Sequence, residues 1–128
     1  MTAKPIRPTR RELAILHALW DRGPSTVREL TAALNREKPT GYTTALKMLQ
    51  VMHEKGLVTR DESKRPQVYR ARYSQEQTQT HLVGDLVQRA FDGSVKAMVM
   101  HALATRPSSP DELEELEKLI DRIERRKK

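Results

Sequence analysis

The sequence predicts a mostly α-helical protein with one small β-hairpin, arranged as two consecutive parts, residues 1–73 and 74–128. Three observations support this prediction. Ser or Thr followed three residues later by Glu or Gln marks four helix starts, because each side chain can then satisfy a free backbone donor of the other residue. Two segments rich in Val, Thr and Tyr flank a polar turn, as in a hairpin. After residue 74, the apolar spacing is helical only.

The four helix starts pair a capping residue with a Glu or Gln in the first turn. They are Thr9 with Glu12, Thr26 with Glu29, Ser74 with Gln77, and Ser109 with Glu112. Each precedes a run with helical apolar spacing, and Pro110 occupies the favoured first position of the last helix. These boxes therefore place the helix starts to within a few residues.

The N-terminal part should contain three helices followed by the hairpin. The first helix, from about Thr9 to Trp20, carries an apolar stripe of Leu13, Leu16 and Trp20. Gly23 and Pro24 end it. The second helix, from Thr26 to Asn35, repeats the spacing with Val27, Leu30 and Leu34. Two strands, at 57–61 and 67–72, follow the third helix and enclose the polar turn.

The third helix, from Gly41 or Tyr42 to Lys55, has two faces of different chemistry. Its apolar face comprises Tyr42, Ala45, Leu49 and Met52. The opposite face carries Thr43, Lys47, Gln50 and Glu54, with Thr44 and Val51 on its flank. Such a helix can pack on a core with one side and present hydrogen-bonding groups with the other.

The C-terminal part is predicted to be helical. Leu82, Val83, Leu86, Val87 and Ala90 give apolar neighbours four residues apart, and Asp92 and Gly93 break the run. A short helix from Ser94 to about Ala104 and a loop at 105–110 follow. The last helix has a narrow seam, typical of helix pairing, formed by Leu113, Leu116, Ile120 and Ile123.

Positive charge is concentrated in the N-terminal part. Residues 1–73 contain 15 Lys and Arg against 7 Asp and Glu, a net +8, whereas residues 74–128 contain 9 against 10, a net −1. The sum is the +7 of the whole chain. A split of this size can arise without function, but it also fits one part that meets phosphate and one that meets protein.

Composition narrows the class of protein further. With 37% hydrophobic and 4% aromatic residues in 128, neither part can bury a large core alone, which favours oligomerisation. The absence of cysteine excludes disulfides and thiolate metal sites. No apolar run reaches the roughly 18 residues of a membrane span. We therefore expect a soluble cytoplasmic protein without membrane insertion, metal or other cofactor.

Helix, turn, helix and a basic-tipped hairpin, in that order, predict a winged helix-turn-helix that enters DNA. The outward side chains of the third helix suit base edges, and the basic hairpin suits the phosphate backbone. The start of the second helix offers amides for a further phosphate. The residues expected to contact DNA are Ser25, Thr26, Tyr42, Thr43, Thr44, Lys47, Gln50, Arg60, Lys64, Arg65 and Arg70.

Several segments resemble the penicillinase and methicillin-resistance repressor family. They are Pro24-Ser-Thr-Val-Arg-Glu-Leu, Gly41-Tyr-Thr-Thr-Ala-Leu-Lys-Met-Leu, Glu54-Lys-Gly-Leu-Val, Val68-Tyr-Arg, Phe91-Asp-Gly-Ser and Ser109-Pro-Asp-Glu-Leu. The resemblance implies a homodimeric transcriptional repressor that binds double-stranded, palindromic operator DNA, with C-terminal helices intertwined across the two-fold axis. The dimer interface is expected to comprise Leu82, Leu86, Phe91, Met98, Leu113, Leu116, Ile120 and Ile123.

Three differences separate the chain from the family pattern. Val51 stands where the family often has Arg. Relatives are cleaved at an Asn-Phe pair after a sensor protease is activated, whereas Met100-His101 occupies the corresponding place here. A copper-responsive branch ends in paired cysteines, which this chain lacks. The resemblance therefore leaves the inducing signal and any upstream sensor protease unidentified.

An enzyme and a winged helix that binds proteins or RNA are the two alternative classes of function. An enzyme is disfavoured because His17, His53, His81 and His101 are scattered and no Gly-rich phosphate loop occurs. A winged helix that docks proteins or binds RNA is the second alternative, since a fold does not determine a function. A docking surface should expose apolar residues on the third helix, where Val51 is the one residue that favours this alternative.

Overall fold

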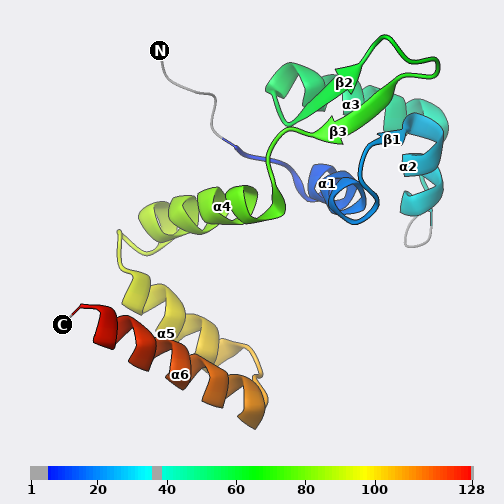
Figure 1. Ribbon diagram of the computed structural model, residues 1–128. Helices are drawn as coiled ribbons and strands as arrows, with labels where there is room; N and C mark the ends of the chain where they lie inside the picture. Colours follow the sequence, from blue (N-terminus) through cyan, green and yellow to red (C-terminus); the bar gives the residue numbers. More distant parts are fainter. Residues whose placement is uncertain (1–5, 36–38, 128) are drawn as a thin grey trace. The chain divides into compact units, whose positions relative to one another are not determined.

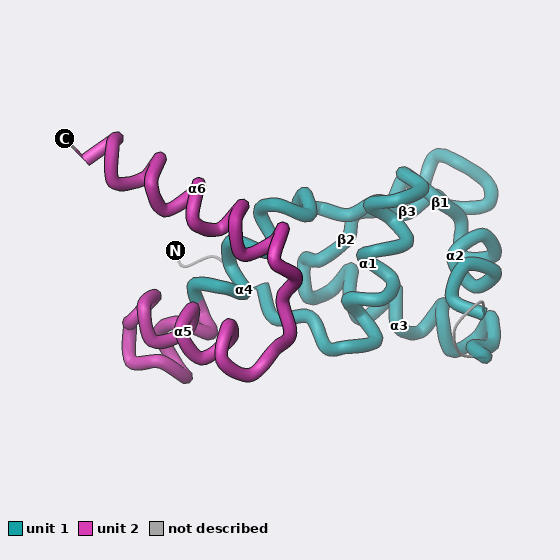
Figure 2. The backbone as a smooth tube through the Cα atoms, turned by 90° about the horizontal axis from the view of Figure 1, so that it is seen from below, with its two compact units in different colours: residues 1–84 teal, residues 85–128 magenta. Residues whose placement is uncertain are grey.

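The computed structural model describes residues 6–35 and 39–127, which form six helices and three short strands (Figure 1). They divide into two compact units, residues 1–84 and 85–128 (Figure 2). The elements are α1 (Arg10–Arg22), β1 (Ser25–Thr26), α2 (Val27–Leu34), α3 (Tyr42–Lys55), β2 (Val58–Asp61), β3 (Val68–Ala71), α4 (Gln75–Ala90), α5 (Val95–Thr105) and α6 (Pro110–Arg126). The mostly helical class with a small antiparallel sheet is thus confirmed.

All four predicted capping boxes are formed. In each, the Ser or Thr hydroxyl accepts the amide of the residue three positions later, whose own side chain accepts the amide of the cap. The eight hydrogen bonds measure 2.8 to 3.2 Å. These local contacts, worth about 1 kcal/mol per cap, set the starts of α1, α2, α4 and α6.

The first unit is built around a core to which α1, α2, α3, β2 and β3 contribute. The most deeply buried residues of α1 are Ile15, Leu16 and Leu19, at 0 to 3% exposure. The predicted stripe is therefore partly wrong, because Leu13 and Trp20 are only half-buried at its edges. The Trp20 Nε1 atom donates a 3.0 Å hydrogen bond to the backbone oxygen of Tyr73, which ties α1 to the end of the hairpin.

The third helix is anchored through its apolar face. Ala45, Leu49 and Met52 are fully buried. The helix ends at Gly56, whose φ of +80° lies in the left-handed region that favours glycine. A Cβ atom at this position would also meet the Arg72 side chain at 3.0 Å. The position of α3 is thus determined by its core contacts and by the turn that leads into β2.

The sheet has three strands in the order β1-β3-β2, one more than the sequence predicts. The hairpin pairs Arg60 with Tyr69 and Asp61 with Val68, and β1 pairs Ser25 with Tyr69 on the other edge of β3. Tyr69, at 1% exposure, belongs to the core. The corner between α1 and α2 is therefore hydrogen-bonded directly to the hairpin.

An ion pair joins the first turn of α1 to the last turn of α3. The Lys55 Nζ atom lies 2.7 Å from Glu12 Oε1, and the Glu12 side chain is 7% exposed. Burial acts to raise the pKa of Glu12, but hydrogen bonds from Lys55 and the Thr9 backbone outweigh it, so this pKa lies below its ordinary value. The pair closes a contact between segments 43 residues apart in the sequence.

The second unit contains the end of α4 together with α5 and α6. Its boundary falls inside α4, at residues 84 and 85, whereas the sequence places the division at residue 73. Asp92 and Gly93, both with positive φ, separate α4 from α5, and the Ser94 hydroxyl caps α5. Neither α5 nor α6 contains a buried residue. None of the helices in the described part combines the length and apolarity needed to cross a bilayer.

Candidate nucleic-acid interface

The outward face of α3 presents the side chains that the sequence assigns to DNA contacts. Thr43, Thr44, Lys47 and Gln50 are all exposed, opposite the buried face that holds the helix. At 100° per residue they fall within about a third of the helix circumference, with Lys47 near its middle. Tyr42, in the first turn on the apolar side of the helix, is half exposed rather than packed inward. The row offers hydroxyl, ammonium and amide groups to a ligand.

The start of α3 differs from the other helix starts in the described chain. Gly41 is its N-cap, and no side chain accepts a hydrogen bond from the first-turn amides. The N-terminus of a helix carries about +0.5 elementary charge and free N–H groups, which an anion can complement. The exposed face of α3 therefore begins at a polar end that is open to phosphate.

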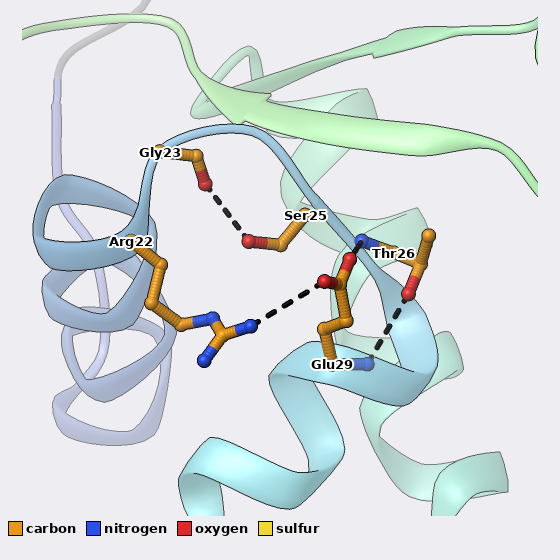
Figure 3. A network of polar contacts seen from close by, with 5 residues as sticks. All are labelled: Arg22, Gly23, Ser25, Thr26 and Glu29. Atoms are coloured by element: carbon orange, nitrogen blue, oxygen red, sulfur yellow. Dashed lines mark hydrogen bonds and ion pairs between the residues drawn. The ribbon is translucent and has the colours of Figure 1, made fainter.

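The start of α2, by contrast, is filled by the protein's own groups (Figure 3). The Glu29 carboxylate accepts the Thr26 amide at 2.9 Å and pairs with Arg22 at 3.4 Å. The Thr26 backbone and then its side chain lower the pKa of Glu29, so the carboxylate is charged at neutral pH. This charge opposes a phosphate at the place where the sequence suggests one.

The side chain of Ser25, a residue expected at the phosphate site, is turned into the protein. Its side chain is buried at 2% exposure, and its hydroxyl donates a 2.8 Å hydrogen bond to the Gly23 oxygen (Figure 3). The residue lies in β1, paired with Tyr69, and it supports the turn rather than reaching the surface. Its neighbour Thr26 is partly exposed, but both its amide and its hydroxyl serve the capping box.

The basic residues of the hairpin fall into two groups, those that bond to Glu62 and those that do not. Arg65 donates from Nη1 to the Glu62 oxygen at 2.7 Å, and Arg60 Nε lies 2.8 Å from the Glu62 carboxylate. A hydrogen bond with Tyr69, followed by that with Glu62, raises the pKa of Arg60. Lys64 and Arg70 are exposed and form no ion pair closer than 4.0 Å within the described residues, although after the hydrogen bonds from Ser63 their charges also lower the pKa of Asp61. These two cations are the ones best placed to meet a phosphate backbone.

Glu62 is the residue of this site that sequence reasoning missed. It holds Arg60 through its side chain and Arg65 through its backbone oxygen. A signal was present in the sequence, because a carboxylate two positions after Arg60 is close enough along the chain to pair with it. The acidic residue at the tip therefore reduces the charge that the hairpin offers to DNA.

The residues expected at the dimer interface form a set of partly and largely exposed apolar side chains. On α6, Leu113, Ile120 and Ile123 are 42%, 50% and 44% exposed, and Leu116 lies between them in the same row. In the remaining set, Leu86 is exposed, whereas Leu82, Phe91 and Met98 are half-buried. The second unit thus leaves apolar surface in water that a second polypeptide could cover.

Two of the four histidines have ring partners. His17 meets Trp20 edge-on with ring centroids 5.1 Å apart, and His101 lies 6.0 Å from Phe91. In the described ranges, no three imidazole or carboxylate side chains gather where they could share a metal ion.

The chain is similar to known transcriptional regulators. Residues 8–122 match the family described as penicillinase repressor. The transcriptional regulator BlaI of Mycobacterium tuberculosis, in strains CDC 1551 and H37Rv, is 32% identical over 92 residues, covering 70% of this chain and 67% of BlaI. A MarR family transcriptional regulator from Silicibacter pomeroyi is 18% identical, with a TM-score of 0.44 over 91% of this chain and 69% of that one. This chain therefore belongs to the penicillinase repressor family of transcriptional regulators.

Proposed function

We propose that this protein represses transcription by binding, as a homodimer, to a palindromic operator in double-stranded DNA. Helix α3 enters the major groove with its outward face, and the hairpin follows the adjacent phosphate backbone. The observation that carries the proposal is the division of α3 into two faces. Its apolar residues Ala45, Leu49 and Met52 have no exposed surface, while Thr43, Lys47 and Gln50 are exposed.

Each outward residue has a defined chemical role in this proposal. Lys47, in the middle of the face, donates to the O6 and N7 acceptors of guanine or to phosphate, and Gln50 pairs with adenine or the backbone. Thr43 and Thr44 contact base edges or thymine methyl groups near the start of the helix. The uncapped start of α3 offers its amides to a phosphate.

The hairpin contributes sequence-independent affinity in the proposed complex. Lys64 and Arg70 release counterions when they meet phosphates, whereas Arg60 and Arg65 hold the tip in shape through Glu62. This division assigns the two pairs of cations different effects on binding, which a salt titration can separate.

The dimer part of the proposal rests on the second unit. Residues 85–128 place no buried side chain in α5 or α6, and chains of about this length rarely form a stable core alone. The row of Leu113, Leu116, Ile120 and Ile123 supports pairing with a second copy of the chain. The two N-terminal units of such a dimer, related by two-fold symmetry, then bind half-sites that lie about one helical turn of DNA, or a multiple of it, apart.

Selection of binding sequences from a random duplex library tests the proposal. We expect an enriched, two-fold symmetric motif that binds roughly 10³-fold or more tighter than a scrambled duplex of equal length. Light scattering in the same buffer should give twice the mass of the chain. Equal affinity for the selected and scrambled duplexes would contradict operator recognition, and tighter binding to RNA would favour the RNA-binding alternative.

A further inference from the structure

An exposed apolar residue lies within the polar face of α3. Among the described residues that precede α4, the large hydrophobic side chains that are exposed are Tyr42 and Val51, and both belong to this helix. Val51 is 48% exposed, whereas the apolar residues Ala45, Leu49 and Met52 on the opposite face are fully buried. The hydroxyl of Tyr42 explains why its side chain is exposed to solvent, because this group can hydrogen-bond to water. The side chain of Val51 has no polar group.

The position of Val51 places it on the surface proposed to enter DNA. It follows Lys47 by four residues, one helical turn, and on a helix such neighbours lie about 5 to 6 Å apart. Thr44, seven residues before Val51, lies two turns away in nearly the same direction. Val51 thus extends the row of Thr44 and Lys47 along the helix.

The major groove offers one apolar group for such a side chain, the C5-methyl group of thymine. We propose that Val51 is a specificity-determining residue that contacts a thymine methyl group in each half-site. This inference rests on the proposed operator binding and adds a base preference to it. Valine suits the role because branching at Cβ fixes one rotamer in a helix, so little side-chain freedom is lost on contact.

The spacing along α3 also limits where the thymine lies. Successive bases along a strand are about 3.4 Å apart, so a separation of 5 to 6 Å corresponds to about two base pairs. The thymine recognised by Val51 should therefore lie within about two base pairs of the base whose preference is relaxed by Lys47→Ala.

Replacement of thymine by deoxyuridine tests the contact, because it removes the methyl group and keeps every hydrogen-bonding edge. Each thymine of the selected duplex is replaced in turn, and the ratio of the two dissociation constants is measured for the full chain. For the wild type, we expect one thymine per half-site to lose about fourfold in affinity, or about fifteenfold when both half-sites are changed. In Val51→Ala that ratio should fall close to one.

A control variant separates this contact from general effects on binding. Val83 on α4 has the same 48% exposure, and Val83→Ala should keep the wild-type ratio at every thymine. Both substitutions introduce a better helix former at an exposed position, so both variants should fold, which circular dichroism checks. Thymines contacted by other side chains should keep their ratio in Val51→Ala.

Three results can be distinguished. A methyl-dependent thymine whose ratio falls only in Val51→Ala supports the inference. Ratios that are the same in wild type and Val51→Ala would overturn it and leave Val51 against the sugar-phosphate backbone or a protein. Failure of the library to enrich any sequence would overturn operator recognition itself, and with it the inference.

Discussion

Removal of the buried carboxylate at the start of α1 tests how α3 is held in the first unit. Glu12→Ala deletes the capping interaction with Thr9, about 1 kcal/mol, and the charged hydrogen bond from Lys55, about 1.5 to 3 kcal/mol. The Lys55 side chain is 38% exposed, so water screens the pair and the lower figure applies. We expect the free energy of unfolding to fall by about 2.5 kcal/mol.

The assay is urea unfolding followed by the fluorescence of Trp20, the chain's single tryptophan, which packs against the core of the first unit. With a slope of about 1 kcal/mol per molar urea, the midpoint should fall by about 2.5 M. Glu29→Ala is the matched control, because Glu29 completes an identical capping box but pairs with Arg22 at the surface. Equal midpoints for the two variants would refute the contribution of the Lys55 pair.

The pH dependence of the same difference tests the direction of the Glu12 pKa. Because this pKa is below 4.5 in the folded protein, the stabilisation is complete above the unfolded value and is lost as pH falls through the folded value. The difference in the free energy of unfolding between wild type and Glu12→Ala should therefore become smaller below about pH 4.5. A gap that widens on acidification would show that burial dominates and that the assigned direction is wrong.

Three further predictions concern binding and assembly. Lys47→Ala should weaken operator binding by about 1 to 3 kcal/mol, measured by anisotropy titration, and unchanged affinity would remove Lys47 from the base contacts. Lys64→Ala should lower the slope of log affinity against log salt by about one. Arg65→Ala should change this slope less, because the Arg65 guanidinium is already bonded to backbone oxygens. Equal slopes for the two variants would contradict the different roles of Lys64 and Arg65. Ile120→Glu should give monomers in light scattering. The control Lys118→Gln, which changes the charge by the same amount about 160° away around α6, should remain dimeric. A wild type that is monomeric at micromolar concentration would refute the dimer.

The sequence predicts what depends on neighbours along the chain. The capping boxes at Thr9, Thr26, Ser74 and Ser109 locate four helix starts because both partners lie within one turn. The two faces of α3 follow from the 3.6-residue period in the same way. For the proposed DNA site, this local pattern was sufficient to predict which side chains of α3 form the exposed row around Lys47.

Features that depend on distant partners were not predictable in this way. Strand β1 consists of two residues, and it exists because β3, more than 40 residues later, supplies its hydrogen bonds. The burial of Ser25 follows from the same pairing. The stripe of α1 was misplaced because the helix is packed from more than one side, so Ile15 and Leu19 are buried more deeply than spacing alone suggests.

The short strand β1 also has a consequence for how the proposed repressor adapts to its targets. Its pairing with Tyr69 and Val68 makes the corner before α2 and the hairpin one hydrogen-bonded piece, with Tyr69 in its core. The start of α2 and the hairpin thus cannot move apart without breaking backbone hydrogen bonds. Any tolerance for operators with unequal spacer lengths must therefore reside in the chain after residue 71.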